Sequence, residues 1–157
     1  MAGAGTYRIG DEPLPGPLQR LAVNPVWPLL TVMFGGSGLS WAWFVLNGFA
    51  LGSPTRRREA ALAAAGLAGS VLLVALLGQL AGSEVLSPAN LRYALVGVTV
   101  WKLAVTYRLY LLQVRCFGLY EYFGGKVANG AIVVIAAVLL YGSFSAQLPP
   151  FLRLVLE

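Results

Sequence analysis

Residues 93–114 read YALVGVTVWKLAVTYRLYLLQV and combine two features that conflict. As a helix rising ~1.5 Å per residue, the mostly apolar segment is long enough to cross the ~30 Å hydrocarbon core of a bilayer. Lys102 nevertheless lies near its middle, and Arg108 follows six residues later. A lysine that faced lipid at this depth would cost at least ~2.5–3.5 kcal/mol. The segment can therefore be a transmembrane helix only if Lys102 faces protein or water.

The composition of the whole chain also favours a membrane. Of 157 residues, 58% are hydrophobic and only 11% are charged, against ~25% charged in an average soluble domain. A soluble fold of this size could not bury so much apolar surface in one core. There is one cysteine and no histidine, so the sequence predicts no disulfide, no metal site, no cofactor and no catalytic set. The net charge of +5 is typical of contact with anionic lipid, and no nucleic-acid partner is predicted.

Four apolar segments predict an all-α fold, an integral membrane four-helix bundle with short loops. The expected spans are residues 26–51, 60–82, 93–114 and 127–148. Residues 1–24, which include the helix-opposing PLPGP, form an extended or interfacial lead-in, and residues 25–157 form a single transmembrane domain. Within the first span, Gly35-Gly36-Ser37-Gly38 predicts a kink or a point of close packing.

Small residues and basic loops predict the packing and the orientation. The second span carries two rows of small residues that would let helices approach closely, Ala61-Ala65-Gly69 and Gly66-Ser70. The loops 53–59 and 115–126 are basic and, with four spans, lie on the same side, which the positive-inside rule makes cytoplasmic. Both termini would then lie outside, and the predicted location is a bacterial inner (plasma) membrane.

On a helical wheel, one face of the third span collects its polar side chains within an arc of ~80°. This polar stripe comprises Thr99, Lys102, Thr106, Tyr110 and Gln113. Arg108 and Arg115 fall on the opposite face, near the cytoplasmic end, where their side chains can reach lipid phosphates. With the loop residues Arg56, Arg57 and Arg58 they are the candidate contacts to anionic headgroups.

The stripe is expected to point into the bundle or into a wet cavity. The first span offers Asn47, Ser37 and Ser40 at matching depth, on one face of their own helix, together with carbonyls near the glycines. Three interpretations of Lys102 remain open. It donates a hydrogen bond to a neighbouring helix, it meets a carboxylate or lipid of a partner subunit, or it lines a site for an anionic ligand or a proton.

The order of residues from Asn24 to Arg58 resembles a known pattern. Asn24-Pro25, Phe34-Gly35-Gly36, Asn47 and Leu51-Gly52 are followed by the three arginines. The pattern is similar to that of a group of small, uncharacterised, polytopic bacterial membrane proteins. The resemblance implies a small polytopic helical fold and no particular activity.

The sequence favours a binding role over chemistry. Our expectation is an accessory or assembly subunit of a larger membrane complex, with other membrane subunits, or further copies of the chain, as partners besides the bilayer. The alternative is a small oligomeric transporter, channel or lipid-binding protein whose cavity is lined by the polar stripe. A membrane enzyme ranks third, because no paired carboxylates or nucleophile–base set is present.

Overall fold

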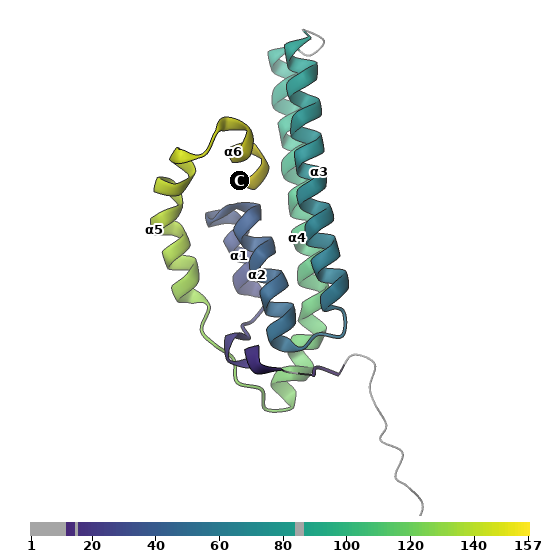
Figure 1. Ribbon diagram of the computed structural model, residues 1–157, viewed down its shortest axis with the longest axis vertical. Helices are drawn as coiled ribbons and strands as arrows, with labels where there is room; N and C mark the ends of the chain where they lie inside the picture. Colours follow the sequence, from purple (N-terminus) through teal and green to yellow (C-terminus); the bar gives the residue numbers. More distant parts are fainter. Residues whose placement is uncertain (1–11, 15, 84–86) are drawn as a thin grey trace, which may run out of the picture.

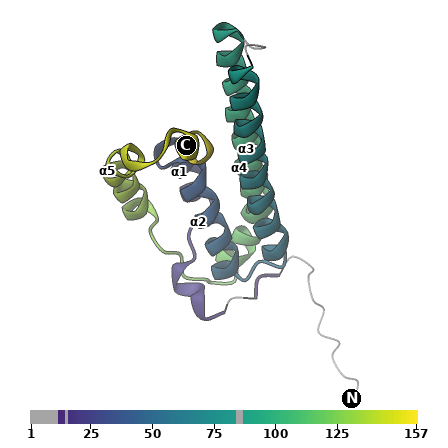
Figure 2. The same cartoon turned by 45° about the horizontal axis from the view of Figure 1, so that its top comes forward.

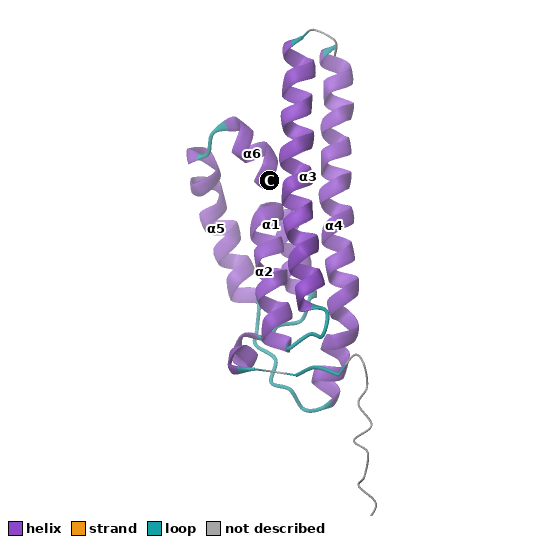
Figure 3. Cartoon of the chain, turned by 45° about the vertical axis from the view of Figure 1, so that its right-hand side comes forward, coloured by secondary structure: helices purple, strands orange, loops and turns teal. Residues whose placement is uncertain are grey.

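In the computed structural model, the residues described are 12–14, 16–83 and 87–157. This part of the chain is all helical, as expected, with an isolated bridge between Val23 and Ala128 and no strand (Figures 1 and 3). The elements are η1 (Pro17–Leu21), α1 (Val26–Phe34), α2 (Gly36–Leu51), α3 (Arg56–Gly82), α4 (Pro88–Tyr122), α5 (Ala131–Gln147) and α6 (Pro150–Leu156). Half of the predicted lead-in, residues 1–11 and 15, lies outside the described residues.

The first expected span is a helical hairpin, and the prediction of a single helix over 26–51 is wrong. The Ser40 hydroxyl donates to the carbonyl of Pro28 at 2.7 Å, although twelve residues separate them. In a continuous helix that separation would be about 18 Å. The chain reverses between α1 and α2 at Gly36, whose φ of +75° is a conformation that side-chain-bearing residues rarely adopt. The glycines predicted to kink a helix instead turn the chain back on itself.

The two ends of this hairpin lie together. The Asn47 side chain accepts a hydrogen bond from the Val23 amide at 2.9 Å, and the Leu14 amide donates to the Gly52 carbonyl at 3.0 Å. The Ala128 amide donates to the Ala22 carbonyl at 2.8 Å, which brings in the connection between α4 and α5. Both basic loops and the described N-terminal residues therefore share one end of the molecule, called the basic end below.

The expectation that the N-terminal side of the chain lies opposite the basic loops is wrong for the described residues that precede α1. Because the 26–51 segment turns back, the residues before it remain at the basic end. The other end of the chain folds back as well, since the Ser37 hydroxyl donates to the Leu156 carbonyl at 3.0 Å. Helix α6 therefore ends over the tip of the α1–α2 hairpin (Figure 2).

The second and third expected spans correspond to α3 and α4, which lie side by side and project beyond the other helices (Figures 1 and 3). These two helices are long and apolar enough to cross a membrane, judged by length and composition. They have 27 and 35 residues, so α4 is longer than the predicted 93–114 at both ends. A side chain at Gly66 would stand 2.7 Å from Val105 of α4, which shows how closely the pair packs.

The fourth expected span is shorter than predicted. Helix α5 has 17 residues, where about 20 are needed to cross a bilayer, and it begins only at Ala131. It packs along α1 and leads into α6 through Pro149 and Pro150. Of the four expected spans, two are long enough to cross a membrane, namely α3 and α4. The chain therefore does not form the predicted four-span bundle.

The central hydrophobic core, which includes Trp41, Phe44 and Leu109, lies between α2, α3 and α4.

Candidate polar site and apolar cavity

A buried polar cluster joins α2, α3 and α4 near the basic end. Gln113 is at its centre and is fully buried, as is Glu59. The Gln113 amide nitrogen donates to a Glu59 carboxylate oxygen at 2.7 Å and to the Phe44 carbonyl at 2.5 Å. Its amide oxygen accepts from Asn47 Nδ2 at 3.0 Å. Gln113 therefore connects three helices, because its side-chain amide both donates and accepts hydrogen bonds.

The carboxylate of Glu59 is held by further donors from the loop before α3. The Ser53 and Thr55 hydroxyls donate to its other oxygen at 2.6 and 2.7 Å. Gly48 on α2 leaves room for this carboxylate, since a Cβ there would collide with Glu59 Oε2. A buried carboxylate is tolerated only when such hydrogen bonds compensate the water it has lost. Across the described residues, no group of three or more carboxylate or cysteine side chains converges on a possible metal position.

The middle of the polar stripe is also buried, and its hydrogen bonds are made within the protein. The buried Thr106 hydroxyl accepts from the Trp41 indole at 2.9 Å and donates to the Lys102 carbonyl at 2.8 Å. Thr99, in contrast, is exposed and bonds to the Leu95 carbonyl of its own helix. Tyr110 is half-buried and stacks on Tyr107, with ring centroids 6.2 Å apart.

Lys102 meets α6, an element beyond the four expected spans. Its ammonium donates to the Leu154 carbonyl at 2.7 Å, and only 6% of the residue is exposed. The carbonyls at the end of a helix lack partners within it and carry partial negative charge, so a lysine is a suitable partner. Lys102 thus donates to a neighbouring helix, as the first of the three interpretations requires. The expected partners Asn47, Ser37 and Ser40 bond elsewhere.

The arginines predicted to contact headgroups lie at or near the basic end. Arg57, Arg58, Arg108 and Arg115 are exposed, and Arg56 is half-buried. Arg108 and Arg115 lie along α4 beside a hollow of about 380 Å³ that Pro54 and Thr55 also line. The guanidinium of Arg56 stacks over the ring of Phe49, 5.7 Å from its centroid.

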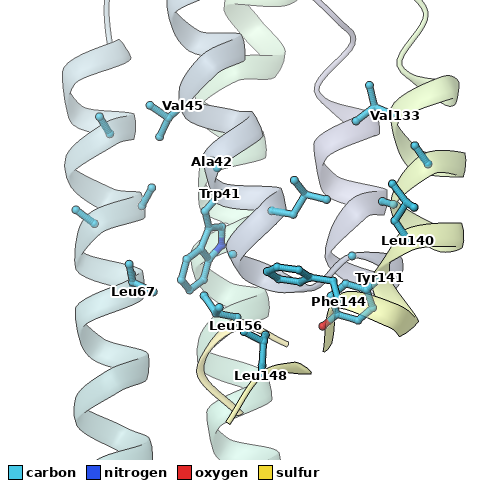
Figure 4. Close-up of a pocket in the computed structure, with 18 residues that line it drawn as sticks. Trp41, Ala42, Val45, Leu67, Val133, Leu140, Tyr141, Phe144, Leu148 and Leu156 are labelled. Carbon is cyan, nitrogen blue, oxygen red and sulfur yellow. The ribbon is translucent and has the colours of Figure 1, made fainter. Parts of the chain in front are cut away.

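A separate cavity of about 730 Å³ lies between α5 on one side and α2 and α3 on the other (Figure 4). Its lining includes Trp41, Leu67, Leu140 and Phe144, and Leu148 and Leu156 lie at one end. Among the residues that the structure describes, no charged, Ser, Thr, Asn or Gln residue lines it, and Tyr141 supplies the one hydroxyl. None of the five residues of the polar stripe belongs to this lining. The stripe and the cavity are therefore separate features.

Sequence reasoning did not find Glu59 or Trp41 as partners of the stripe. Glu59 lies four residues after Thr55, a spacing at which side chains on one face of a helix meet. Trp41 lies in the segment predicted as one span with a kink at its glycines. No local pattern indicates that α6 returns to Lys102, because that contact joins residues 52 positions apart.

The chain matches no known family model, no curated protein and no solved structure.

Proposed function

We propose that this chain is an integral membrane protein in which α3 and α4 cross the bilayer and the α1–α2 hairpin enters from the basic end without crossing. Support comes from the length and hydropathy of α3 and α4. A reversed backbone is compatible with lipid where protein surrounds it, and the turn at Gly36 lies against Leu156 and Tyr141. The arginines gathered at the basic end support a cytoplasmic location for that end, and the membrane in this proposal is the inner membrane of a bacterium.

Its function in this proposal is that of an accessory or assembly subunit of a larger membrane complex. The observation that carries the proposal is the closed polar core. Lys102, Thr106 and Gln113 are buried and hydrogen-bonded to other parts of the same chain. The transporter and channel alternatives require the polar stripe to line a cavity, and the stripe does not line the apolar one. In this proposal, the protein binds its partner subunit through its apolar outer surfaces.

The outward face of α3 is the surface we assign to the partner. Ala61, Ala65 and Ala68 are exposed along this face, whereas Gly66 and Ser70 of the second row are buried. Small side chains on a spanning helix let another helix approach closely and gain packing contacts. The partner is accordingly an apolar transmembrane helix of a larger subunit.

Purification in mild detergent from the native membrane tests this function. The full chain should elute with a larger membrane protein in fixed stoichiometry. Ala65→Trp should abolish this association, because the indole blocks the outward face. Ala64→Trp is the matched control, since Ala64 lines the cavity on another face of the same helix and should keep the partner. A wild-type chain that elutes alone, or only with copies of itself, would contradict the proposal.

A further inference from the structure

The apolar cavity, together with the helical turn that leads to Arg56, has the length of one leaflet of a bilayer. Along α3 its lining runs from Ala60 to Leu67, and Arg56 lies one helical turn before Ala60 on the same face. The distance from Arg56 to Leu67 along the helix is about 16 Å. Half of the hydrocarbon core is about 15 Å. At its inner end, Leu156 of α6 packs against Gly38, where an added Cβ would stand 2.8 Å from Leu156 Cδ2. In the proposed membrane placement, the cavity and the turn beside Arg56 together therefore extend from the basic surface to the middle of the bilayer.

A cation lies one helical turn beyond the lining, on its basic side. On α2 the last lining residue, Val45, is one turn before Phe49 on the same face. The Arg56 guanidinium stacks on Phe49, so it is held one turn beyond the lining on both α2 and α3. Among the residues described, the structure pairs Arg56 with no carboxylate. An anionic group at this position would meet a fixed positive charge.

The closed inner end of the cavity separates a lipid chain from a protein helix. Helix α6 closes this end, so a helix that continued across the bilayer would collide with it. A flexible hydrocarbon chain needs less width and can end at the middle of the bilayer.

We propose that this cavity binds one acyl chain of an anionic glycerophospholipid from the basic-side leaflet, whose phosphate contacts Arg56. The site rests on the proposed membrane placement but not on a partner subunit, because the cavity and the outward face of α3 are different surfaces. The lipid would fill the space between α5 and the α2–α3 pair, and thereby hold α5 against the rest of the protein.

Native mass spectrometry of the full chain tests the site. The protein is released from nanodiscs that contain equal amounts of palmitoyl-oleoyl phosphatidylglycerol and phosphatidylcholine. The wild-type chain should retain one phosphatidylglycerol. Ala64→Trp and Val133→Trp fill the cavity from opposite walls and should each lower the occupancy by about tenfold or more. Ala65→Trp, on the outward face, should leave occupancy unchanged. Folded cavity variants that retain as much lipid as the wild type would overturn the proposal.

The role of Arg56 is tested in the same assay. Arg56→Gln should lower the preference for phosphatidylglycerol over phosphatidylcholine by about fivefold, the effect of one basic residue near an anionic headgroup. Arg57→Gln, which removes an exposed arginine from the same first turn of α3, should change it less. Equal effects of the two substitutions would assign the preference to the general charge of this turn and would overturn the Arg56 contact.

A wild-type measurement covers the case in which the cavity variants do not fold. Phosphatidylglycerol with a diazirine near the end of its acyl chain is cross-linked to the chain in nanodiscs, and the adducts are mapped. Adducts should concentrate on lining residues such as Leu67 and Leu140. Adducts confined to outward residues such as Leu72 and Ile132, or a polypeptide found in the cavity, would overturn the proposal. A chain that binds no lipid but still co-purifies with its partner would contradict the lipid site alone and would leave the proposed function standing.

Discussion

At the level of single residues, the stability of the fold depends on a few buried side chains that each hydrogen-bond to more than one part of the chain. Gln113 bonds to α2 and α3, and Glu59 receives three donors. In a buried site, removing one member leaves its partners without hydrogen bonds, which costs more than the lost bond itself. The polar cluster is therefore a point at which small substitutions have large effects.

Gly48 provides the sharpest test of the cluster. We expect Gly48→Ala to destabilise the protein by about 2–3 kcal/mol, because the methyl group would displace the Glu59 carboxylate and contact Gln113 Nε2 at 3.1 Å. Gly78→Ala is the matched control, since nothing lies within 4 Å of the added methyl in α3, and alanine favours a helix. Unfolding in detergent by added sodium dodecyl sulfate measures both. Equal stability of the two variants would contradict the described packing.

Gln113→Leu removes the bridge while it keeps the volume. We expect a loss of about 2–4 kcal/mol, because the Glu59 carboxylate and the Asn47 amide each lose a buried partner. Gln79→Leu, at an exposed position of α3, should change stability by less than about 0.5 kcal/mol. The same unfolding assay applies, and a neutral Gln113→Leu would show that the cluster is not held as described.

At the level of elements, α6 is attached to the rest of the protein through its last carbonyls. Lys102 binds the Leu154 carbonyl and Ser37 binds the Leu156 carbonyl. Its own length of seven residues is too short for independent helical stability. The position of α6 over the hairpin tip, and with it the closed end of the cavity, therefore depends on these contacts.

Lys102→Met should release α6 without unfolding the molecule. Loss of a charge-assisted hydrogen bond of about 1.5–3 kcal/mol should raise amide hydrogen exchange in α6 by roughly 10- to 100-fold. Exchange in the middle of α3 and α4 should stay unchanged. Lys126→Met, at an exposed lysine of the α4–α5 connection, should leave α6 protected. Unchanged α6 exchange in Lys102→Met would exclude this attachment.

The elements also show how far the sequence could predict the structure. Apolar length located α3 and α4, because each helix is continuous and hydropathy measures continuous length. The same measure failed for 26–51, because a hairpin of two apolar helices has the composition of one long span, and only the φ of Gly36 separates them. Helical periodicity found Lys102, Thr106 and Gln113 as an inward face, but their partners on α3 and α6 are set by tertiary packing.

At the level of the whole molecule, the central claim is that residues 26–51 enter and leave at the same end. This placement leaves α3 and α4 as the two helices that can cross the bilayer. It gathers the described residues before α1, both basic loops and the Arg56 end of the cavity on one side. A continuous first span would instead separate Gln19 from Pro54 by the full thickness of the membrane.

Cysteine accessibility in sealed native membrane vesicles tests this claim most directly. Single cysteines replace Gln19, Pro54, Tyr122 or Ser83, which are exposed, in a chain whose buried Cys116 is changed to alanine. A maleimide that cannot cross membranes should label the first three from the same side, and Ser83→Cys from the opposite side. Labelling of Gln19→Cys and Pro54→Cys from opposite sides would contradict the hairpin and restore a first transmembrane span.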